Sequence, residues 1–236
     1  MIALRIAIFL LGLAIVVRTL ISAVRTFVVP RGARDLLASL VFSLVRSLFQ
    51  IALLRANTYE QRDRVMAFFA PVGSLLLLPA WLILIALGYV LMYWSTGIQA
   101  LQDDIVISGS SLLTLGFTKG NSLIHSLLAF SEATIGLIMV ALLIAYLPTM
   151  YNAFQQRELA VTLLEVRAGA PPSAVEMLTR FHRLHSLDKL HDLWEMWETW
   201  FAQIEESHTS LAALVFFRSP QPDHSWVTAS GAVLDA

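Results

Sequence analysis

The sequence predicts an all-α membrane protein with three transmembrane helices, a short helix that dips into the bilayer and returns, and a helical C-terminal region. Three observations lead to this fold class: the composition, the length of the apolar runs, and a Gly- and Ser/Thr-rich loop between the last two runs. Of the 236 residues, 57% are hydrophobic and 14% are charged. Soluble domains carry roughly 25% charged residues. One soluble core cannot hide this much apolar surface, so the bilayer is the expected solvent.

Three apolar runs are long enough to cross a bilayer. The hydrocarbon core is about 30 Å thick and needs about 20 apolar residues in a helix. The runs cover residues 4–24, 65–94 and 123–147. The second run ends with Tyr89, Tyr93 and Trp94, and the third with Tyr146 and Tyr151, which is typical of an aromatic belt at a membrane surface. We therefore expect three spans.

Charge predicts how these spans are oriented. The segment 25–64 holds an excess of basic residues: Arg25, Arg31, Arg34, Arg46, Arg55, Arg62 and Arg64 against Asp35, Glu60 and Asp63. Short segments rich in Lys and Arg stay in the cytoplasm. We expect a cell-membrane protein with its N-terminus outside and its C-terminus in the cytoplasm. The first run is interpreted as a retained helix, because no small-x-small cleavage site follows it.

The basic segment also contains an apolar stretch, residues 36–55, with Arg46 and Gln50 near its centre. Charged and amide side chains are expensive in the middle of a bilayer. We interpret this stretch as a helix that lies in the membrane interface. A fourth, buried span is the alternative.

The loop that separates the last two runs has the sequence GSSLLTLGFTKGNS, residues 109–122. It does not match the phosphate-binding pattern G-x-x-x-x-G-K-[S/T], because Phe117 follows Gly116 and Gly120 follows Lys119. A plain linker is one alternative. The preceding stretch is too apolar for an exposed loop, and it begins with acidic residues, which helix N-termini favour. We therefore expect a short helix that enters the membrane and returns as this loop, which is tolerated only inside protein or beside water.

The residues Thr114-Leu115-Gly116-Phe117 resemble the front of the T-x-G-[Y/F]-G-[D] selectivity filter of pore-loop potassium channels. More narrowly, SGSSLLTLGF, SEATIGLIMVALLIAYLPTMYNAFQQRE, LLEVRAGAPPSA and ESHTSLAALVFFRSPQPDHSW are similar to bacterial membrane proteins of the potassium-channel family that carry an extra N-terminal span and a helical C-terminal region. The resemblance covers most of the chain. It implies four identical chains around one pore, with potassium or another monovalent cation as the permeant ion, the lipid bilayer as surroundings, and no cofactor.

The resemblance also implies roles for individual residues. The filter would be built from backbone carbonyls that replace the hydration shell of the ion, with glycine where φ is positive. Its residues are Thr114, Leu115, Gly116, Phe117 and Thr118. Lys119 would stand at the outer mouth, and Gly136 and Pro148 are gating candidates.

The sequence departs from the family pattern after Phe117, where Thr118-Lys119 replaces Gly-Asp. A β-branched threonine adopts positive φ only at a cost, and four lysines would place like charges at the outer mouth. The alternative function is therefore a non-conducting membrane scaffold or sensor with a degenerate pore loop.

Two polar residues in the third run have two interpretations each. Glu132 is either a brace or cavity charge near the filter, or a buried acid bonded to hydroxyls of the short helix such as Ser110 or Ser111. His125 is either a polar residue at the outer membrane interface with no further role, or a pH-sensing group.

The implied organisation has four parts. Residues 1–24 form an N-terminal transmembrane helix, residues 25–64 a cytoplasmic or interfacial segment, and residues 148–236 a cytoplasmic helical region. Residues 65–147 form a pore module. This module consists of an outer helix (65–94), a pore helix with the filter (98–120) and an inner helix (122–147).

In the C-terminal region, Gly169 before two prolines predicts a helix end, and Ser173-x-x-Glu176 predicts the start of a long helix that continues to about Ser207. A heptad-like stripe follows along that helix: Leu187, Leu190, Trp194, Trp197, Phe201 and Ile204. It predicts either an oligomerisation bundle or packing on the same chain's LAALVFF segment, residues 211–217.

Several function classes are not expected. The net charge of −1 argues against nucleic-acid binding, which needs a basic excess. The chain has no cysteine, which excludes disulfides and thiolate metal sites. His182, His185 and Asp188 are interpreted as a solvated helix face and not as a metal site. No arrangement of nucleophile and base or of paired carboxylates predicts an enzyme, so no catalytic residue is assigned.

Overall fold

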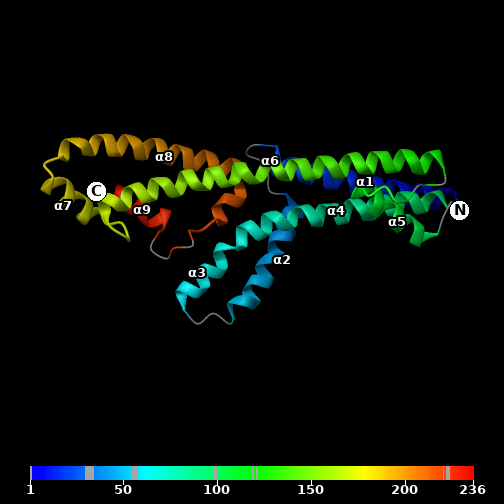
Figure 1. Cartoon of the computed structure of the whole chain (residues 1–236), viewed down its shortest axis with the longest axis horizontal. Coiled ribbons are helices and arrows are strands. Elements are labelled where there is room, and N and C mark those ends of the chain that lie inside the picture. Colours follow the sequence, from blue (N-terminus) through cyan, green and yellow to red (C-terminus); the bar gives the residue numbers. More distant parts are fainter. Residues whose placement is uncertain are drawn as a thin grey trace. The chain divides into compact units, whose positions relative to one another are not determined.

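The computed structural model describes residues 2–29, 35–54, 58–97, 100–118, 120, 122–219, 221 and 224–236. These residues form helices and connecting loops, with no strand among them. Figure 1 shows the helices in chain order. Lys119 lies outside the described residues, as do Arg31, Arg34 and Arg55.

Four helices in the described part of the chain are long and apolar enough to cross a membrane. They include the three predicted runs, and the fourth is the stretch interpreted from the sequence as interfacial. The helices are α1 (Ile2–Phe27), α2 (Leu36–Leu53), α4 (Phe69–Thr96) together with the end of α3 (Tyr59–Ala67), and α6 (Leu123–Ala168). The chain thus has the makeup of a membrane-embedded protein.

The chain divides into two compact units. Unit 1 comprises Met1–Ser43 and Gly73–Leu147, and unit 2 comprises Leu44–Val72 and Pro148–Ala236. The chain passes between the units at three points, inside α2, α4 and α6, and the last of these lies between Leu147 and Pro148.

In unit 1, α1 runs antiparallel to α4. The Arg5 guanidinium at the start of α1 donates to the Thr96 carbonyl at the end of α4, over 3.4 Å. Towards the other end of α1, the Trp81 indole N–H donates to the Ser22 hydroxyl over 3.1 Å. Between these points two glycines allow close backbone approach, because a Cβ on Gly12 would lie 2.4 Å from the Gly88 carbonyl oxygen.

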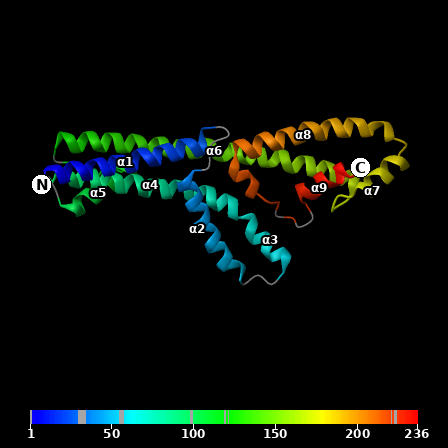
Figure 2. The ribbon, with the colours of Figure 1, turned by 180° about the vertical axis from the view of Figure 1, so that it is seen from behind.

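The unit 1 part of α6 runs antiparallel to α4. The His125 ring at the start of α6 lies edge-on to the Tyr93 ring near the end of α4. At the opposite end, the Phe27 ring contacts both Trp81 of α4 and Tyr146 of α6. The short helix α5 (Leu101–Leu112) lies beside the end of α4 and the start of α6 (Figures 1 and 2).

The second apolar run forms two helices instead of one. α3 ends at Ala67 and α4 begins at Phe69. Proline has no N–H and its ring clashes with the carbonyl four residues earlier. For Pro71 that carbonyl belongs to Ala67, which explains the position of the break. Pro79 lies within α4 without ending it.

Unit 2 contains the rest of α6, α7 (Ala174–Arg183), the 3₁₀ turns η1 (Leu187–Lys189) and η2 (Ala212–Phe216), α8 (Leu190–Ser210) and α9 (Trp226–Leu234). Its core joins apolar side chains of α6, α7, α8 and α9, including Val161, Leu164, Met177, Trp197 and Ala229. α6 ends at Ala168, before Gly169 with φ of +80°, as the sequence predicts.

The single long helix predicted from Ser173 to about Ser207 is wrong. The Ser173 side chain makes no capping hydrogen bond, and the helix is divided between α7 and α8. His185 takes φ of +51°, and the Ser186 N–H donates to the Phe181 carbonyl. This is the Schellman arrangement that ends helices, with histidine where glycine is usual.

The buried stripe of α8 also differs from the predicted one. Leu190, Leu193, Trp197 and Trp200 are buried, whereas Leu187 and Trp194 of the predicted stripe are exposed. The stripe packs against α6, α7 and α9, so the stripe is used within the chain and its partners extend well beyond the predicted segment 211–217.

Candidate functional site

The loop after α5 reverses the chain direction within two residues. The Thr114 N–H donates to the Ser111 carbonyl over 3.0 Å, and the Leu115 N–H donates to the Ser110 carbonyl over 2.8 Å. Together they form a Schellman motif in which Thr114 takes φ of +53°. Glycine usually fills this position, and a non-glycine residue there costs roughly 1–3 kcal/mol. Such strain is concentrated at functional sites, so it marks this loop.

Positive φ recurs two residues later, at Gly116 with φ of +70°. Thr114 and His185 are the only residues other than glycine with positive φ in the described part of the chain, so Thr118 does not adopt it. Leu115 and Phe117 are 60% and 67% exposed, and Thr118 is half-buried. Lys119, predicted at the outer mouth, lies outside the described residues.

Glu132 lies on α6 and is fully buried. The Ser108 hydroxyl on α5 donates to Oε1 over 2.5 Å, and the Tyr93 hydroxyl on α4 donates to Oε2 over 3.1 Å. The carboxyl group therefore connects three helices. The sequence predicts a bond to an α5 hydroxyl such as Ser110 or Ser111, whereas the partner is Ser108, which precedes them on the same helix.

The first turn of α6 carries a second buried polar group. His125 is fully buried, and its Nε2 atom lies 2.8 Å from the Thr96 hydroxyl of α4. Because the imidazole is buried and lies within hydrogen-bond distance of Thr96, the interpretation of His125 as a polar residue at the membrane interface is wrong. Asp104, in the first turn of α5, is also fully buried, and neither of its carboxylate oxygens has a hydrogen-bond partner among the described residues.

The two gating candidates occupy different surroundings. Gly136 is buried against the end of α5, since a Cβ there would lie 2.2 Å from the Leu112 carbonyl oxygen. Close packing of α6 on α5 therefore explains why this position needs a residue without a Cβ. The role of Gly136 as a hinge stays a prediction. Pro148 is exposed and lies inside α6, which continues to Ala168.

The sequence analysis missed four residues of this polar cluster: Tyr93, Thr96, Asp104 and Ser108. Tyr89 and Tyr93 were assigned to an aromatic belt, but both are buried. The Tyr89 hydroxyl lies 2.8 Å from the Ser131 hydroxyl. A usable signal was the spacing of Tyr89 and Tyr93, four residues apart and thus on one face of α4.

Unit 2 has its own buried charge, Arg157 on α6. The guanidinium donates to the Phe217 carbonyl over 2.7 Å and to the Leu214 carbonyl over 3.3 Å, and it pairs with Glu158 over 3.2 Å. This arrangement attaches the η2 segment to α6. It satisfies backbone carbonyls and leaves little of the cation for a ligand.

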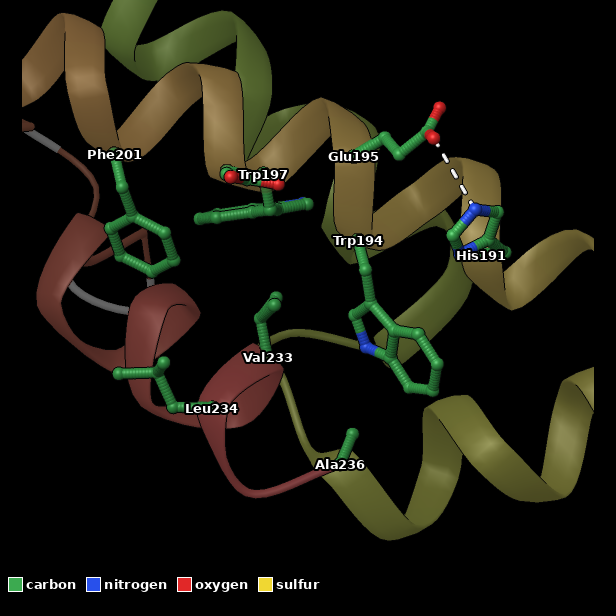
Figure 3. Close-up of a pocket in the computed structure, with 9 residues that line it drawn as sticks. His191, Trp194, Glu195, Trp197, Phe201, Val233, Leu234 and Ala236 are labelled. Carbon is green, nitrogen blue, oxygen red and sulfur yellow. Dashed lines mark ion pairs between the residues drawn. The ribbon is translucent and has the colours of Figure 1, made fainter.

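A pocket of about 500 Å³ lies between α8 and α9 in unit 2 (Figure 3). Its apolar lining includes Trp194, Trp197, Phe201 and Val233. Its charged lining residues, His191, Glu195 and Glu198, stand on the exposed face of α8, and His191 pairs with Glu195. Polar groups do not converge inside the pocket, so unit 1 holds the stronger candidate site.

The residues described do not include any group of three His, Cys, Asp or Glu side chains arranged to hold a metal ion. The chemistry of unit 1 is therefore that of a strained loop with exposed backbone and apolar side chains, backed by a buried carboxyl group. No protein-family profile, no curated protein and no solved structure matches the chain.

Proposed function

We propose that the chain assembles as a tetrameric pore-loop cation channel of the potassium-channel type, with residues 114–118 lining the ion path. The observation that carries this proposal is the loop geometry. A short helix between two long apolar helices ends in a strained turn, and a buried carboxyl group attaches that helix to both neighbours.

The length of α5 supports a re-entrant path. Its 12 residues extend about 18 Å at 1.5 Å per residue, which is too short for a hydrocarbon core of about 30 Å. A helix of this length with buried polar groups at its first turn and its middle fits between spans. It does not fit as a span of its own.

The electrostatics of α5 support cation binding. A helix carries about half a negative charge at its C-terminal end, and the loop begins directly after that end. Positive φ occurs at Thr114 and Gly116, which is the backbone conformation expected where the carbonyls of a filter turn towards the pore. Rings of such carbonyls replace the hydration shell of a permeating cation.

Assembly of four copies is supported by what one chain leaves exposed. Leu115 and Phe117 are mostly uncovered in the single chain. One loop cannot surround an ion, whereas four loops around an axis form closed rings of carbonyls. The resemblance of Thr114-Leu115-Gly116-Phe117 to a potassium-channel filter supports the same number of chains.

Flux through the purified protein in liposomes tests this proposal. Potassium flux that exceeds sodium flux and is blocked by barium is the expected result for the parent chain. A second protein carries Thr118→Gly and Lys119→Asp, which restores the usual family pattern. Absence of flux in both proteins, with both folded and tetrameric, contradicts the channel.

The second candidate function is a non-conducting scaffold or sensor that keeps the pore architecture. The pair Thr118-Lys119 favours it, because Thr118 does not adopt positive φ and lysine adds positive charge. Under this candidate, the parent is silent and only the double variant conducts. Light scattering of the protein in detergent, corrected for bound detergent, gives the number of chains and distinguishes a tetramer from a monomer.

A further inference from the structure

The surface of α2 divides into three strips along the helix. One strip is packed, with Val45 buried and Ala38, Val41 and Phe42 against the unit 1 core. The other two strips are exposed. At 100° per residue, Ser39, Ser43, Arg46 and Gln50 share the polar strip, and Leu36, Leu40, Leu44, Leu48 and Ile51 share the apolar strip, in which Ser47 is the one polar residue.

The two exposed strips lie side by side, which distinguishes α2 from a helix surrounded by lipid. The apolar strip is strongly exposed, with its five apolar side chains between 59% and 67% accessible. A helix inside the hydrocarbon shows apolar groups on its whole lipid-facing surface, because an arginine at the bilayer centre costs at least about 2.5 kcal/mol. A helix at the membrane surface places one strip among acyl chains and the other in water.

The start of α2 lies near the end of unit 1 that is opposite to the pore loop. Asp35, just before α2, accepts a hydrogen bond from the Ser22 hydroxyl over 2.5 Å, and Ser22 also contacts Trp81. Ser22 is 17 residues from Arg5, and Trp81 is 15 residues from Thr96. At about 1.5 Å per residue, these separations equal about 25 Å and about 22 Å. The hydrocarbon core of about 30 Å is therefore nearly crossed where α2 begins.

The first two turns of α2 belong to unit 1 and stay at this end of it. The Phe42 ring packs on Gly73, where a Cβ would lie 2.5 Å from a ring carbon. Gly73 is 23 residues from Thr96, or about 35 Å along α4, and so lies farther from the loop than Trp81. The unit 1 part of α2 therefore lies at the end of this unit that is opposite to the pore loop.

We propose that α2 lies on the membrane surface opposite to the pore loop, with its leucine strip at the boundary of acyl chains and headgroups. Its polar strip, which includes Arg46, faces water. The occupant of the leucine strip is the bilayer itself. This proposal requires only a membrane-embedded chain and holds whether or not the loop conducts ions.

The absence of cysteine from the sequence makes a direct depth measurement simple. Single variants Leu40→Cys, Leu44→Cys and Leu48→Cys report the apolar strip, and Ser39→Cys and Gln50→Cys report the polar strip. Each full-length protein is spin-labelled in liposomes, and its depth is measured from the relative access of oxygen and a water-soluble nickel chelate. Ile83→Cys on α4, whose side chain is exposed, is the deep reference, and free label in buffer is the aqueous reference.

The surface arrangement predicts equal, shallow depths at the three leucine positions and water access at the two polar positions. Depth that rises to one maximum near Leu44 and falls towards both helix ends, regardless of strip, shows a spanning helix and overturns the proposal. Protection of the leucine positions from both reagents, with spin–spin broadening between copies, shows a subunit contact and also overturns it.

A measurement of whether the chain crosses the membrane an odd or an even number of times tests the same proposal without changing α2. Three crossings place the two ends of the chain on opposite sides of the membrane, whereas four crossings place them on the same side. Short epitope tags at each end of the full chain are probed with antibody in sealed vesicles and again after permeabilisation. Ends on opposite sides are expected, and ends on the same side contradict the surface position of α2.

Discussion

The Oε1 atom of Glu132 on α6 lies 2.5 Å from the Ser108 hydroxyl on α5, and both side chains are fully buried. With Tyr93 donating to the other oxygen, the carboxyl group attaches the helix before the loop to both long helices. A buried polar network with satisfied partners makes a structure specific, and removal of one member leaves the others unpaired.

We expect Glu132→Ala to destabilise the protein by at least about 2 kcal/mol, because two buried hydroxyls each lose an acceptor at about 1–3 kcal/mol. Glu132→Gln should cost less, since its amide oxygen still accepts one bond. Thr134→Ala is the matched control, because Thr134 is exposed on the same helix and its hydroxyl donates to the Phe130 carbonyl one turn earlier. Thermal unfolding in detergent measures all three. Equal stability of Glu132→Ala and Thr134→Ala would show that the carboxyl group does not hold α5.

Two glycines give a paired prediction. Gly136→Ala places a Cβ 2.2 Å from the Leu112 carbonyl oxygen, whereas Gly109→Ala meets no atom within 4 Å in the single chain. The first should destabilise the fold by about 1–3 kcal/mol through overpacking. The second should stabilise α5 by about 0.5–1 kcal/mol, because alanine is the better helix former.

Unfolding and flux measured on the same two variants separate packing from hinge motion at Gly136. A hinge role alone predicts altered flux with unchanged stability for Gly136→Ala. Loss of stability together with loss of flux is the result expected from the contact with α5.

The stability of unit 2 should depend on pH through His208. Burial lowers the pKa of the His208 imidazole from its ordinary value, and the nearby Arg157 cation adds to this effect. The unfolded chain therefore takes up the proton first as pH falls. The neutral His208 imidazole therefore makes its full contribution to stability above about pH 6.5, the ordinary histidine pKa. This contribution is lost as the pH falls through the lower pKa that His208 has in the folded protein.

Replacement of His208 by Gln should flatten the loss of stability between about pH 7.5 and pH 5, a range that includes the ordinary histidine pKa. Urea unfolding of the full chain, followed by tryptophan fluorescence, reports it, because His208 stacks on Trp226. His182→Gln, on the exposed face of α7, is the control and should keep the slope of the parent. An unchanged slope for His208→Gln would assign the pH dependence to another group.

Arg157 should be essential for the attachment of η2. Arg157→Ala removes the donor to two carbonyls, Leu214 and Phe217, at a cost of at least about 2 kcal/mol. Arg157→Lys keeps the charge but lacks the planar fork that serves several acceptors, so it should be intermediate. Limited proteolysis between residues 211 and 219 should accelerate in the order parent, Lys, Ala. Arg183→Ala, at an exposed position of α7, is the control for the general effect of removing an arginine. If Arg183→Ala is cleaved as fast as Arg157→Ala, Arg157 does not specifically attach η2.

The sequence by itself determined the helical class, the three long apolar helices and the short helix before the loop. It also placed the end of α6 at Gly169. These features depend on local quantities, namely hydropathy over about 20 residues and the conformational freedom of one glycine. Each is readable without knowing which segments meet in space.

Only the tertiary structure decided which polar groups share the site. Tyr93 and Glu132 are 39 residues apart, and Ser108 and Glu132 are 24 apart, so no local pattern pairs them. The packing of α8 on α6, α7 and α9 selected Leu193 and Trp200 over Leu187 and Trp194 as buried positions. His185 at positive φ likewise ended α7 where the sequence favours a continuous helix, because local propensity is weak compared with the burial of apolar side chains on several neighbouring helices at once.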